Sequence, residues 1–239
     1  MSVNTALVVS AHSADFVWRA GGAIALHAAK GWQVTVVCLS YGERGESAKL
    51  WRQPGMTLER VKQSREAEAK RAAEHLSVHD IQFWDLGDYP INLTEAAFYR
   101  LVDVYRAIHP KFVLSHSKED IYNHDHPAVT DFAQHARITA QAHGHNPGQK
   151  VLGAPPVFLF EPHQPEQCNW KPDVLLDVSS VWDKKRAAIE CMEGQEHLWE
   201  YYTRVALQRG AQAARNSDKS IKHGEGYQAV FPHVVETLA

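Results

Sequence analysis

Two nearly continuous apolar runs, separated by a segment with helical spacing, constrain the fold of this chain more than any other feature. The runs cover residues 6–11 and 33–40, and apolar residues recur at helical intervals over residues 16–30. A strand that is apolar on both faces needs cover on both faces, and a helical crossover leads to a parallel neighbour. The pattern therefore predicts an α/β fold with a parallel sheet between two layers of helices.

The alternation of helices and strands continues along the chain. Helices are predicted over 57–76, 94–108 and 127–143, and a helical region that breaks near Gly194 is predicted over 181–214. Strands are predicted over 81–84, 112–115, 157–160 and 174–178, with an edge strand over 227–232. Since no linker, repeat or low-complexity tract interrupts the pattern, we expect one domain over residues 1–239 with a mostly parallel, Rossmann-like sheet.

Composition and charge argue against several classes of protein. The chain has 25 Lys and Arg against 28 Asp and Glu, so it lacks the broad basic field that binds nucleic acid. No apolar run approaches the roughly 20 residues of a membrane span, and no basic segment precedes the N-terminal apolar stretch. Cys38, Cys168 and Cys191 have no CxxC spacing, which argues against a disulfide framework. We expect a cytoplasmic protein without nucleic-acid or membrane partners.

Polar segments follow four of the predicted strands at their carboxyl ends. In an open parallel sheet these ends share one edge, and ligands bind in the crevice beyond it. The segments are 11–15, 41–47, 116–126 and 161–163, and they hold several of the 15 histidines of the chain. Histidine is the commonest protein ligand of metals and titrates near neutral pH. We therefore expect these four segments to form one site.

His12 and Asp15 are the first candidates for a metal site. They lie three residues apart at a strand-to-helix turn, and the His124-Asp125-His126 cluster offers a further imidazole. Two histidines and a carboxylate leave a position for water, as in catalytic zinc sites. Asp15 alone would also suit the N-terminal cap of the following helix. The pattern favours Zn²⁺, although Mn, Fe and Co accept the same ligands.

Several motifs, in this order along the chain, resemble the PIG-L/LmbE family of zinc-dependent deacetylases. They are SAHSAD at 10–15, YGERGES at 41–47, Arg65 with Glu68, and NHDHPAV at 123–129. The family shows AHPDD, a turn rich in Gly and Glu, an RxxE helix and HPDH in the same order. The resemblance implies metal ligands at His12, Asp15 and His126, and a substrate-contacting arginine at Arg65.

Two departures from the family pattern affect the expected chemistry. Ala14 stands where the family has the aspartate that acts as general base, and a methyl group accepts no proton. Asn123 stands where the family has the first histidine of HPDH, which assists collapse of the tetrahedral intermediate. The resemblance thus implies that the metal ligands are kept while the machinery of amide hydrolysis is missing.

The variant motifs SAHSADFVWRAGG, YGERGES and FEPHQPE are similar to one branch of this family, the 4-oxalomesaconate (4-carboxy-2-hydroxymuconate) hydratases of bacterial gallate and protocatechuate breakdown. This similarity implies a zinc-dependent hydro-lyase that adds water to a carbon-carbon double bond conjugated to a 2-oxo acid. The product would be 4-carboxy-4-hydroxy-2-oxoadipate. The similarity also implies a homo-oligomer, such as a hexamer.

Glu46 and His163 are the candidate acid and base for this reaction. They follow different strands, and both side chains can transfer protons near neutral pH. Glu46 lies on a loop bounded by glycines and Pro54, and His163 lies between two prolines. Each would also fit a solvated loop position.

A tricarboxylate substrate requires cations in the site. Arg44, Arg65 and Lys118 lie in or beside the four polar segments, and Arg19 lies close by; arginine suits carboxylates because it can bind them through two parallel hydrogen bonds. Further candidate substrate contacts are Tyr122, Asn123 and His124, while Asp125 could orient a ligand histidine.

Two other functions stay open at this point. The chain could be a zinc-dependent deacetylase of N-acetylglucosaminyl-type substrates, with Glu46 or Asp125 in place of the missing base. Alternatively, it could be a non-catalytic protein that binds a metal or a small acid.

Overall fold

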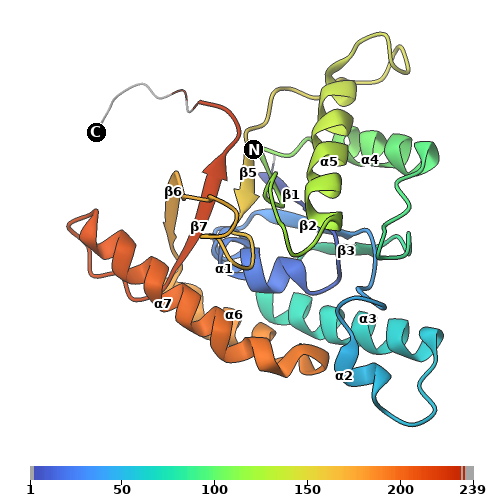
Figure 1. Cartoon of the computed structure of the whole chain (residues 1–239). Coiled ribbons are helices and arrows are strands. Elements are labelled where there is room, and N and C mark those ends of the chain that lie inside the picture. Colours follow the sequence, from blue (N-terminus) through green and yellow to red (C-terminus); the bar gives the residue numbers. More distant parts are fainter. Residues whose placement is uncertain (1–2, 233, 235–239) are drawn as a thin grey trace.

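A single seven-stranded sheet organises the computed structural model, which describes residues 3–232 and 234. The strand order is β3-β2-β1-β4-β5-β7-β6, with helices on both faces (Figure 1). The strands are β1 Thr5–Ser10, β2 Gln33–Cys38, β3 Asp80–Phe83, β4 Phe112–Ser115, β5 Val157–Phe160, β6 Val174–Asp177 and β7 Gly224–Ala229. β1 to β5 pair in parallel, and β7 runs antiparallel to both of its neighbours.

The helices fall into two layers. They are α1 Asp15–Ala29, α2 Ala48–Trp51, α3 Leu58–Leu76, α4 Glu95–Ile108, α5 Asp125–Gln141, α6 Trp182–Glu190 and α7 Trp199–Arg215, with 3₁₀ segments η1 Ser179–Val181 and η2 Glu193–Leu198. α1, α3 and α6 pack on one face of the sheet, and α4 and α5 on the other. The predicted Rossmann-like, mostly parallel sheet is therefore confirmed.

The core explains why the strands are apolar along their whole length. In β1, Ala6 and Val8 point into the layer of α1 and α3, whereas Leu7 and Val9 point into the layer of α4 and α5. Each layer supplies buried apolar side chains, and full burial of a leucine such as Leu7 stabilises the fold by about 2 kcal/mol. Cover on both faces therefore removes the alternation that marks a half-exposed strand.

The prediction of an edge strand over 227–232 was wrong in both its bounds and its position in the sheet. The strand is β7, Gly224–Ala229, and it lies inside the sheet between β5 and β6. Its glycines leave room for close neighbours: a Cβ on Gly224 would lie 2.8 Å from the backbone of Arg209 in α7, and one on Gly226 would lie 3.1 Å from Trp170. These glycines weaken the apolar pattern of a strand that is nevertheless internal.

The sheet order places the site. β1 pairs with β2 on one side and β4 on the other, so the chain leaves the carboxyl ends of β1 and β4 into opposite helix layers. This reversal of strand order forms a crevice at the carboxyl ends, the usual ligand position in open α/β sheets. The extent of the domain over 1–239 stays a prediction, although one sheet unites every strand of the described residues.

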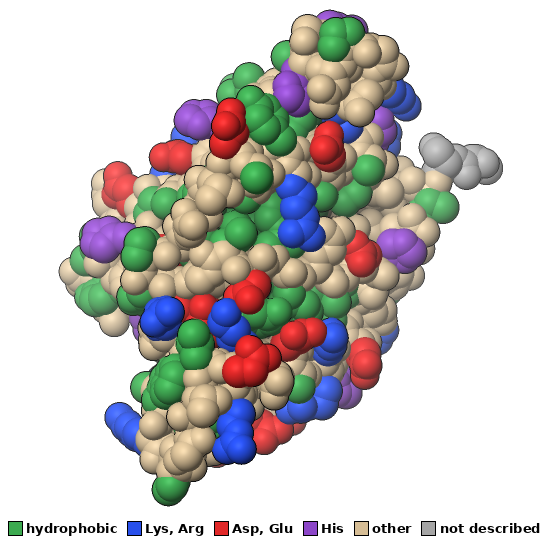
Figure 2. Space-filling model, turned by 90° about the vertical axis from the view of Figure 1, so that its right-hand side faces the viewer, with side chains coloured by type: hydrophobic (Ala, Val, Ile, Leu, Met, Phe, Trp, Pro, Cys, Tyr) green, Lys and Arg blue, Asp and Glu red, His purple; other side chains and the backbone are tan. Residues whose placement is uncertain are grey.

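One face of the molecule carries charged side chains of both signs (Figure 2). On the face in Figure 2, Lys and Arg are interspersed with Asp and Glu, as the net charge of -3 suggests. No helix within residues 3–232 and 234 is long and apolar enough to cross a membrane.

Candidate active site and metal centre

The turn after β1 brings His12 and Asp15 together. The Oδ2 atom of Asp15 accepts a hydrogen bond from the backbone N of His12 at 2.8 Å and lies 3.1 Å from its Nδ1 atom. His12 is fully buried and Asp15 is 1% exposed. The N-cap position of α1 is Ala14 and carries no side-chain cap hydrogen bond, so the capping role that Asp15 would also suit is wrong. The carboxylate instead bonds back to the turn after β1 and faces the imidazole of His12.

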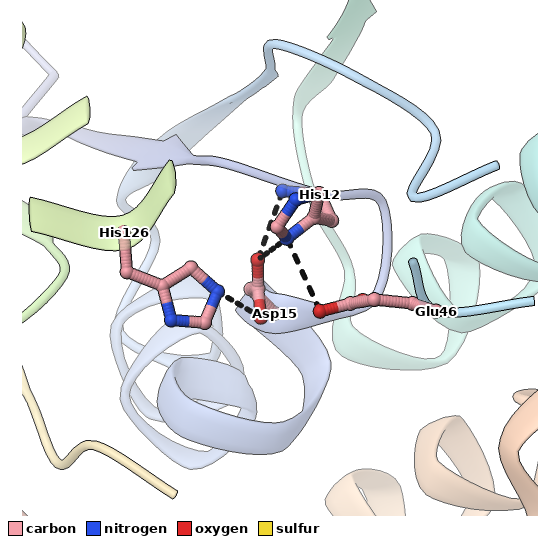
Figure 3. A group of neighbouring side chains, drawn as sticks. All are labelled: His12, Asp15, Glu46 and His126. Carbon is pink, nitrogen blue, oxygen red and sulfur yellow. Dashed lines mark hydrogen bonds and ion pairs between the residues drawn. The ribbon is translucent and has the colours of Figure 1, made fainter. Parts of the chain in front are cut away.

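His126 and Glu46 complete a cluster around Asp15. His126 lies in the first turn of α5, with its Nε2 atom 3.5 Å from Oδ1 of Asp15. Glu46, on the loop after β2, places Oε1 at 3.2 Å from Nδ1 of His12. Figure 3 shows the Asp15 carboxylate between His126 on one side and His12 and Glu46 on the other. One potential ligand atom from each of the four residues lies within 4.8 Å of the others.

Each histidine of the cluster is oriented by a carboxylate behind it. Nδ1 of His126 lies 2.8 Å from Oδ2 of Asp120, and Nε2 of His12 lies 3.4 Å from Oδ2 of Asp125. The Asp125 carboxylate is itself held by the backbone N atoms of Tyr89 and Ile91, both at 3.0 Å. A proton on the outer nitrogen of each ring leaves the inner nitrogen as an electron-pair donor toward the cluster.

His116 supports the ring of His126 from behind. The two rings stack with centroids 4.1 Å apart, and the backbone N of Ala11 donates to Nε2 of His116 at 2.9 Å. Burial, together with the charge of His126, lowers the pKa of His116 well below its ordinary value, so this ring is neutral. The sequence prediction missed its role, although His116 directly follows β4 in one of the four polar segments.

The cluster fits a divalent metal. Burial lowers the pKa of His12, but Glu46, Asp125 and Asp15 together raise it well above its ordinary value. Burial raises the pKa of Asp15, but His126, His116 and His12 bring it well below its ordinary value. Nε2 of His126 has no hydrogen-bond partner among the described residues. Two imidazoles and two carboxylates that favour a positive charge between them are a donor set that Zn²⁺ accepts.

Replacing Asp120 by asparagine is expected to weaken metal binding by about 10- to 100-fold, because the amide no longer polarises His126. The backbone N of Tyr122 donates a hydrogen bond to Oδ1 of Asp120 at 3.1 Å, and the side-chain oxygen of asparagine can still accept it. Competition with a chromogenic chelator measures the affinity. The exposed Asp103 of α4 gives a matched control in Asp103→Asn, and equal affinities in the two variants would contradict the orienting role of Asp120.

A cavity of about 200 Å³ opens beside the cluster and joins the other predicted segments. The residues that line it come from α1, α5, η2 and α7 and from the loops after β2, β3, β4 and β5: Asp15, Trp18, Arg19, Glu46, Tyr89, Asp120, Tyr122, Asn123, His126, His163, Gln195, His197, Leu198 and Tyr202. The loops after β1, β2, β4 and β5 thus converge as predicted. Nδ2 of Asn123 also lies 3.5 Å from Oε1 of Glu46, so the residue at the departure from the family motif contacts one of the two candidates for acid and base.

Four of the predicted substrate contacts, Arg44, Arg65, Lys118 and His124, do not line this cavity. Arg44, Lys118 and His124 are exposed, and the backbone N of Arg44 is held by Asp88 at 3.0 Å. His124 forms the N-terminal cap position of α5, outside the ring of Asp15, Glu46 and His126. Their contact with substrate stays a prediction.

Arg65 acts within the protein. It is fully buried; Nη1 lies 2.6 Å from Oε2 of Glu68, and Nη2 donates to Oε1 of Gln195 at 2.6 Å. Oε1 of Glu68 accepts the backbone N of Gly194 at 2.8 Å. Arg65 and Glu68 thereby fix the η2 segment, whose Gln195 lines the cavity, and the arginine does not line the cavity itself.

Gln195, His197 and Tyr202 line the cavity but were not predicted from the sequence, which offered Arg19 only as a cation close to the polar segments. Arg19 carried a local signal, because it lies four residues after Asp15 on the same face of α1. The residues of η2 and α7 carried none, since they are distant in sequence and follow no predicted strand.

Comparisons with known proteins agree with this architecture. Residues 7–137 match the family model PIG-L: GlcNAc-PI de-N-acetylase. A Pseudomonas putida KT2440 protein named 4-oxalmesaconate hydratase is 63% identical, over 98% of this chain and 92% of its own length. The crystal structure of GalB, the 4-carboxy-2-hydroxymuconate hydratase from the same strain, covers 99% of this chain and 100% of its own, at 63% identity and a TM-score of 0.97.

A more distant solved structure shares the fold alone. The N,N'-diacetylchitobiose deacetylase from Pyrococcus horikoshii is 19% identical with a TM-score of 0.79, and the match covers 96% of this chain and 84% of that one. Because the family model spans more than half of the chain and the 63% identical relative spans nearly all of it, this protein belongs to the PIG-L family.

Proposed function

We propose that this protein is a metal-dependent hydratase that converts 4-oxalomesaconate (4-carboxy-2-hydroxymuconate) to 4-carboxy-4-hydroxy-2-oxoadipate. The observation that carries the proposal is the 63% identity, over 98% of the chain, with a relative named for this activity. The residues at the site agree with it, since Ala14 and Asn123 replace the base and the histidine of the deacetylase motifs.

His12, Asp15 and His126 would hold the metal, which we propose to be Zn²⁺. Once bound, such an ion supplies a Lewis acid that polarises a water molecule or an oxygen of the substrate. The carboxylates of Asp120 and Asp125 keep the two rings in the orientation that donates toward the ion. The buried position of the cluster strengthens these interactions because the local dielectric is low.

Glu46 and His163 would carry the two proton transfers. Hydration of a double bond needs one group that takes a proton from water and another that gives a proton to the neighbouring carbon. Glu46 lines the cavity beside the cluster, and its carboxylate would accept the proton of water there. His163 lines the same cavity and would return a proton to carbon.

The environment of His163 supports its role as donor in the substrate complex. Burial and the nearby Arg19 guanidinium lower the pKa of His163 below its ordinary value in the free protein, while Asp120 and Glu46 act in the opposite direction. A bound tricarboxylate brings negative charge and offsets the effect of Arg19, which raises the pKa of the imidazole. His163 would therefore gain its proton as substrate binds.

Replacing His163 by glutamine is expected to lower kcat about 100-fold, because glutamine carries no titratable proton. Stopped-flow loss of the dienoate absorbance measures the rate, and elemental analysis checks that the metal content stays that of the wild type. The exposed His135 of α5 provides the control His135→Gln, which should behave as the wild type. An unchanged kcat in His163→Gln would remove this residue from the reaction.

The test of the proposed function compares two substrates on the metal-loaded protein. We expect the dienoate absorbance of 4-carboxy-2-hydroxymuconate to decay and N-acetylglucosaminyl substrates to release no acetate. Acetate release without dienoate turnover would instead support the deacetylase activity named in the family model. Binding of metal with turnover of neither substrate would support the non-catalytic alternative.

We also propose a cytoplasmic location. Cys38, Cys168 and Cys191 are all free and buried, which suits a reducing compartment. Assembly into a homo-oligomer stays a prediction.

A further inference from the structure

Arg19 is a buried cation on the wall of the cavity. It lies in α1, one turn after Asp15, and its side chain is only 6% exposed. Among the described residues that line the cavity, it is the one lysine or arginine. Burial lowers its pKa, but Tyr202, Asp15, Asp120 and Glu46 together raise it, so the guanidinium stays charged.

The hydrogen bonds of Arg19 are incomplete within the described residues. Nη1 donates to the backbone O of Glu161 at 2.7 Å. Nε lies 3.5 Å from Oδ1 of Asp15 but makes no hydrogen bond with any described residue. A buried guanidinium normally needs several acceptors, because an unpaired buried charge is costly.

Two other buried arginines of the described chain, Arg209 and Arg65, have carboxylate partners for their guanidinium groups. Arg209 binds the Glu161 carboxylate through two hydrogen bonds of 2.7 and 2.6 Å. Arg65 is paired with Glu68 and Gln195. Glu161 therefore gives its carboxylate to Arg209 and only its backbone oxygen to Arg19. The Glu161 carboxylate is therefore already paired with Arg209, and Arg19 keeps donor capacity on the wall of the cavity.

The cavity is lined by several carboxylates, so a negatively charged ligand would need the N–H donors of Arg19. Asp15, Glu46 and Asp120 all line it, so an anionic ligand would meet three carboxylates there. A substrate with three carboxylates of its own needs a fixed positive charge besides the metal. Arg44 and Lys118 are exposed, and Arg65 is fully paired behind η2.

We propose that Arg19 binds one carboxylate of the substrate and sets the specificity of the cavity for polycarboxylates. This inference rests on the proposed hydratase function for the identity of the substrate. Its core is a carboxylate-binding subsite on α1, at the position where the sequence resemblance placed no ligand. The Glu161 carbonyl holds Nη1 and the Asp15 carboxylate lies beside Nε, which fixes the guanidinium on the wall of the cavity where it would meet the ligand.

The test pairs Arg19 variants with substrate analogues. In Arg19→Gln, kcat/KM for the tricarboxylate should fall about 100-fold, mainly through KM, as expected for loss of a charge-assisted hydrogen-bonded pair. Three analogues, each lacking a different carboxylate, are assayed in parallel. For the analogue that lacks the carboxylate bound by Arg19, kcat/KM should be nearly the same in Arg19→Gln and in the wild type. Arg19→Lys keeps the charge and should recover part of the loss.

An equal loss on the tricarboxylate and all three analogues would overturn the inference, because a structural role affects every substrate alike. The exposed Arg215 of α7 gives the control Arg215→Gln. Binding of propane-1,2,3-tricarboxylate, followed by tryptophan fluorescence, supplies a readout independent of turnover. Lack of wild-type turnover would count against the proposed function alone, whereas equally tight binding of this probe to wild type and Arg19→Gln would count against the subsite.

Discussion

Replacing Glu46 by glutamine is expected to lower kcat about 1,000-fold while the protein keeps the metal content of the wild type. Glutamine has nearly the same size, but its amide cannot take a proton from water. Oε1 of Glu46 lies 3.2 Å from Nδ1 of His12, and the residue lines the cavity, so the carboxylate stands beside the metal cluster where it would meet water. Single-turnover kinetics and elemental analysis of the same sample measure the two quantities.

The exposed Glu119, from the loop after β4, supplies the matched control Glu119→Gln, which should keep full activity. Two results would contradict the role of Glu46. Unchanged turnover in Glu46→Gln would show that Glu46 is a solvated loop residue without a role in the reaction. Loss of the metal together with activity would make Glu46 a ligand of the ion instead of the base.

Removal of the metal is expected to abolish turnover, and addition of Zn²⁺ should restore it. In the stripped protein the carboxylates of Asp15 and Glu46 remain close together within a 4.8 Å cluster, without the divalent charge that the donor set favours. Metal that binds only the folded state also stabilises it, by about 4 kcal/mol when its concentration exceeds the dissociation constant a thousandfold. The melting temperature should therefore rise on reloading. Dialysis against a chelator, followed by activity and thermal unfolding measurements, tests both effects.

The variant Asp15→Asn tests whether the restored activity and stability depend on the proposed metal ligand Asp15. Asparagine keeps an oxygen for the backbone N of His12 but removes the charge between the two histidines. We expect this variant to gain neither activity nor thermal stability at metal concentrations that restore the wild type. Full turnover in wild-type protein that elemental analysis finds free of metal would contradict the metal-dependent mechanism.

The sequence was sufficient for the parts of the site that local spacing and sheet topology control. His12 and Asp15 are three residues apart, so their contact follows from one turn. Glu46, His126 and His163 are distant in sequence, but each follows a parallel strand, and the carboxyl ends of such strands meet at one edge. That single rule placed all three beside the same cavity.

The position of β7 in the sheet and the roles of the buried arginines could not be predicted, because they depend on contacts between residues that are distant in sequence. β7 is glycine-rich because α7 and Trp170 pack close to its backbone, so its pattern suggested an edge strand although it is internal. The resemblance gave Arg65 a substrate contact, whereas its guanidinium meets Gln195, 130 positions further along the chain. Arg19 stands out only once the residues that line the cavity and its own hydrogen-bond partners are known.

The most direct test of the central claim is the identity of the product made from 4-carboxy-2-hydroxymuconate by the zinc-loaded protein. NMR of the reaction mixture should show the vinyl protons of the substrate replaced by methylene protons, and the mass of the product should exceed that of the substrate by one water. A substrate that stays unchanged, or that only changes tautomer with no gain in mass, would contradict the assignment of this chain as a hydratase.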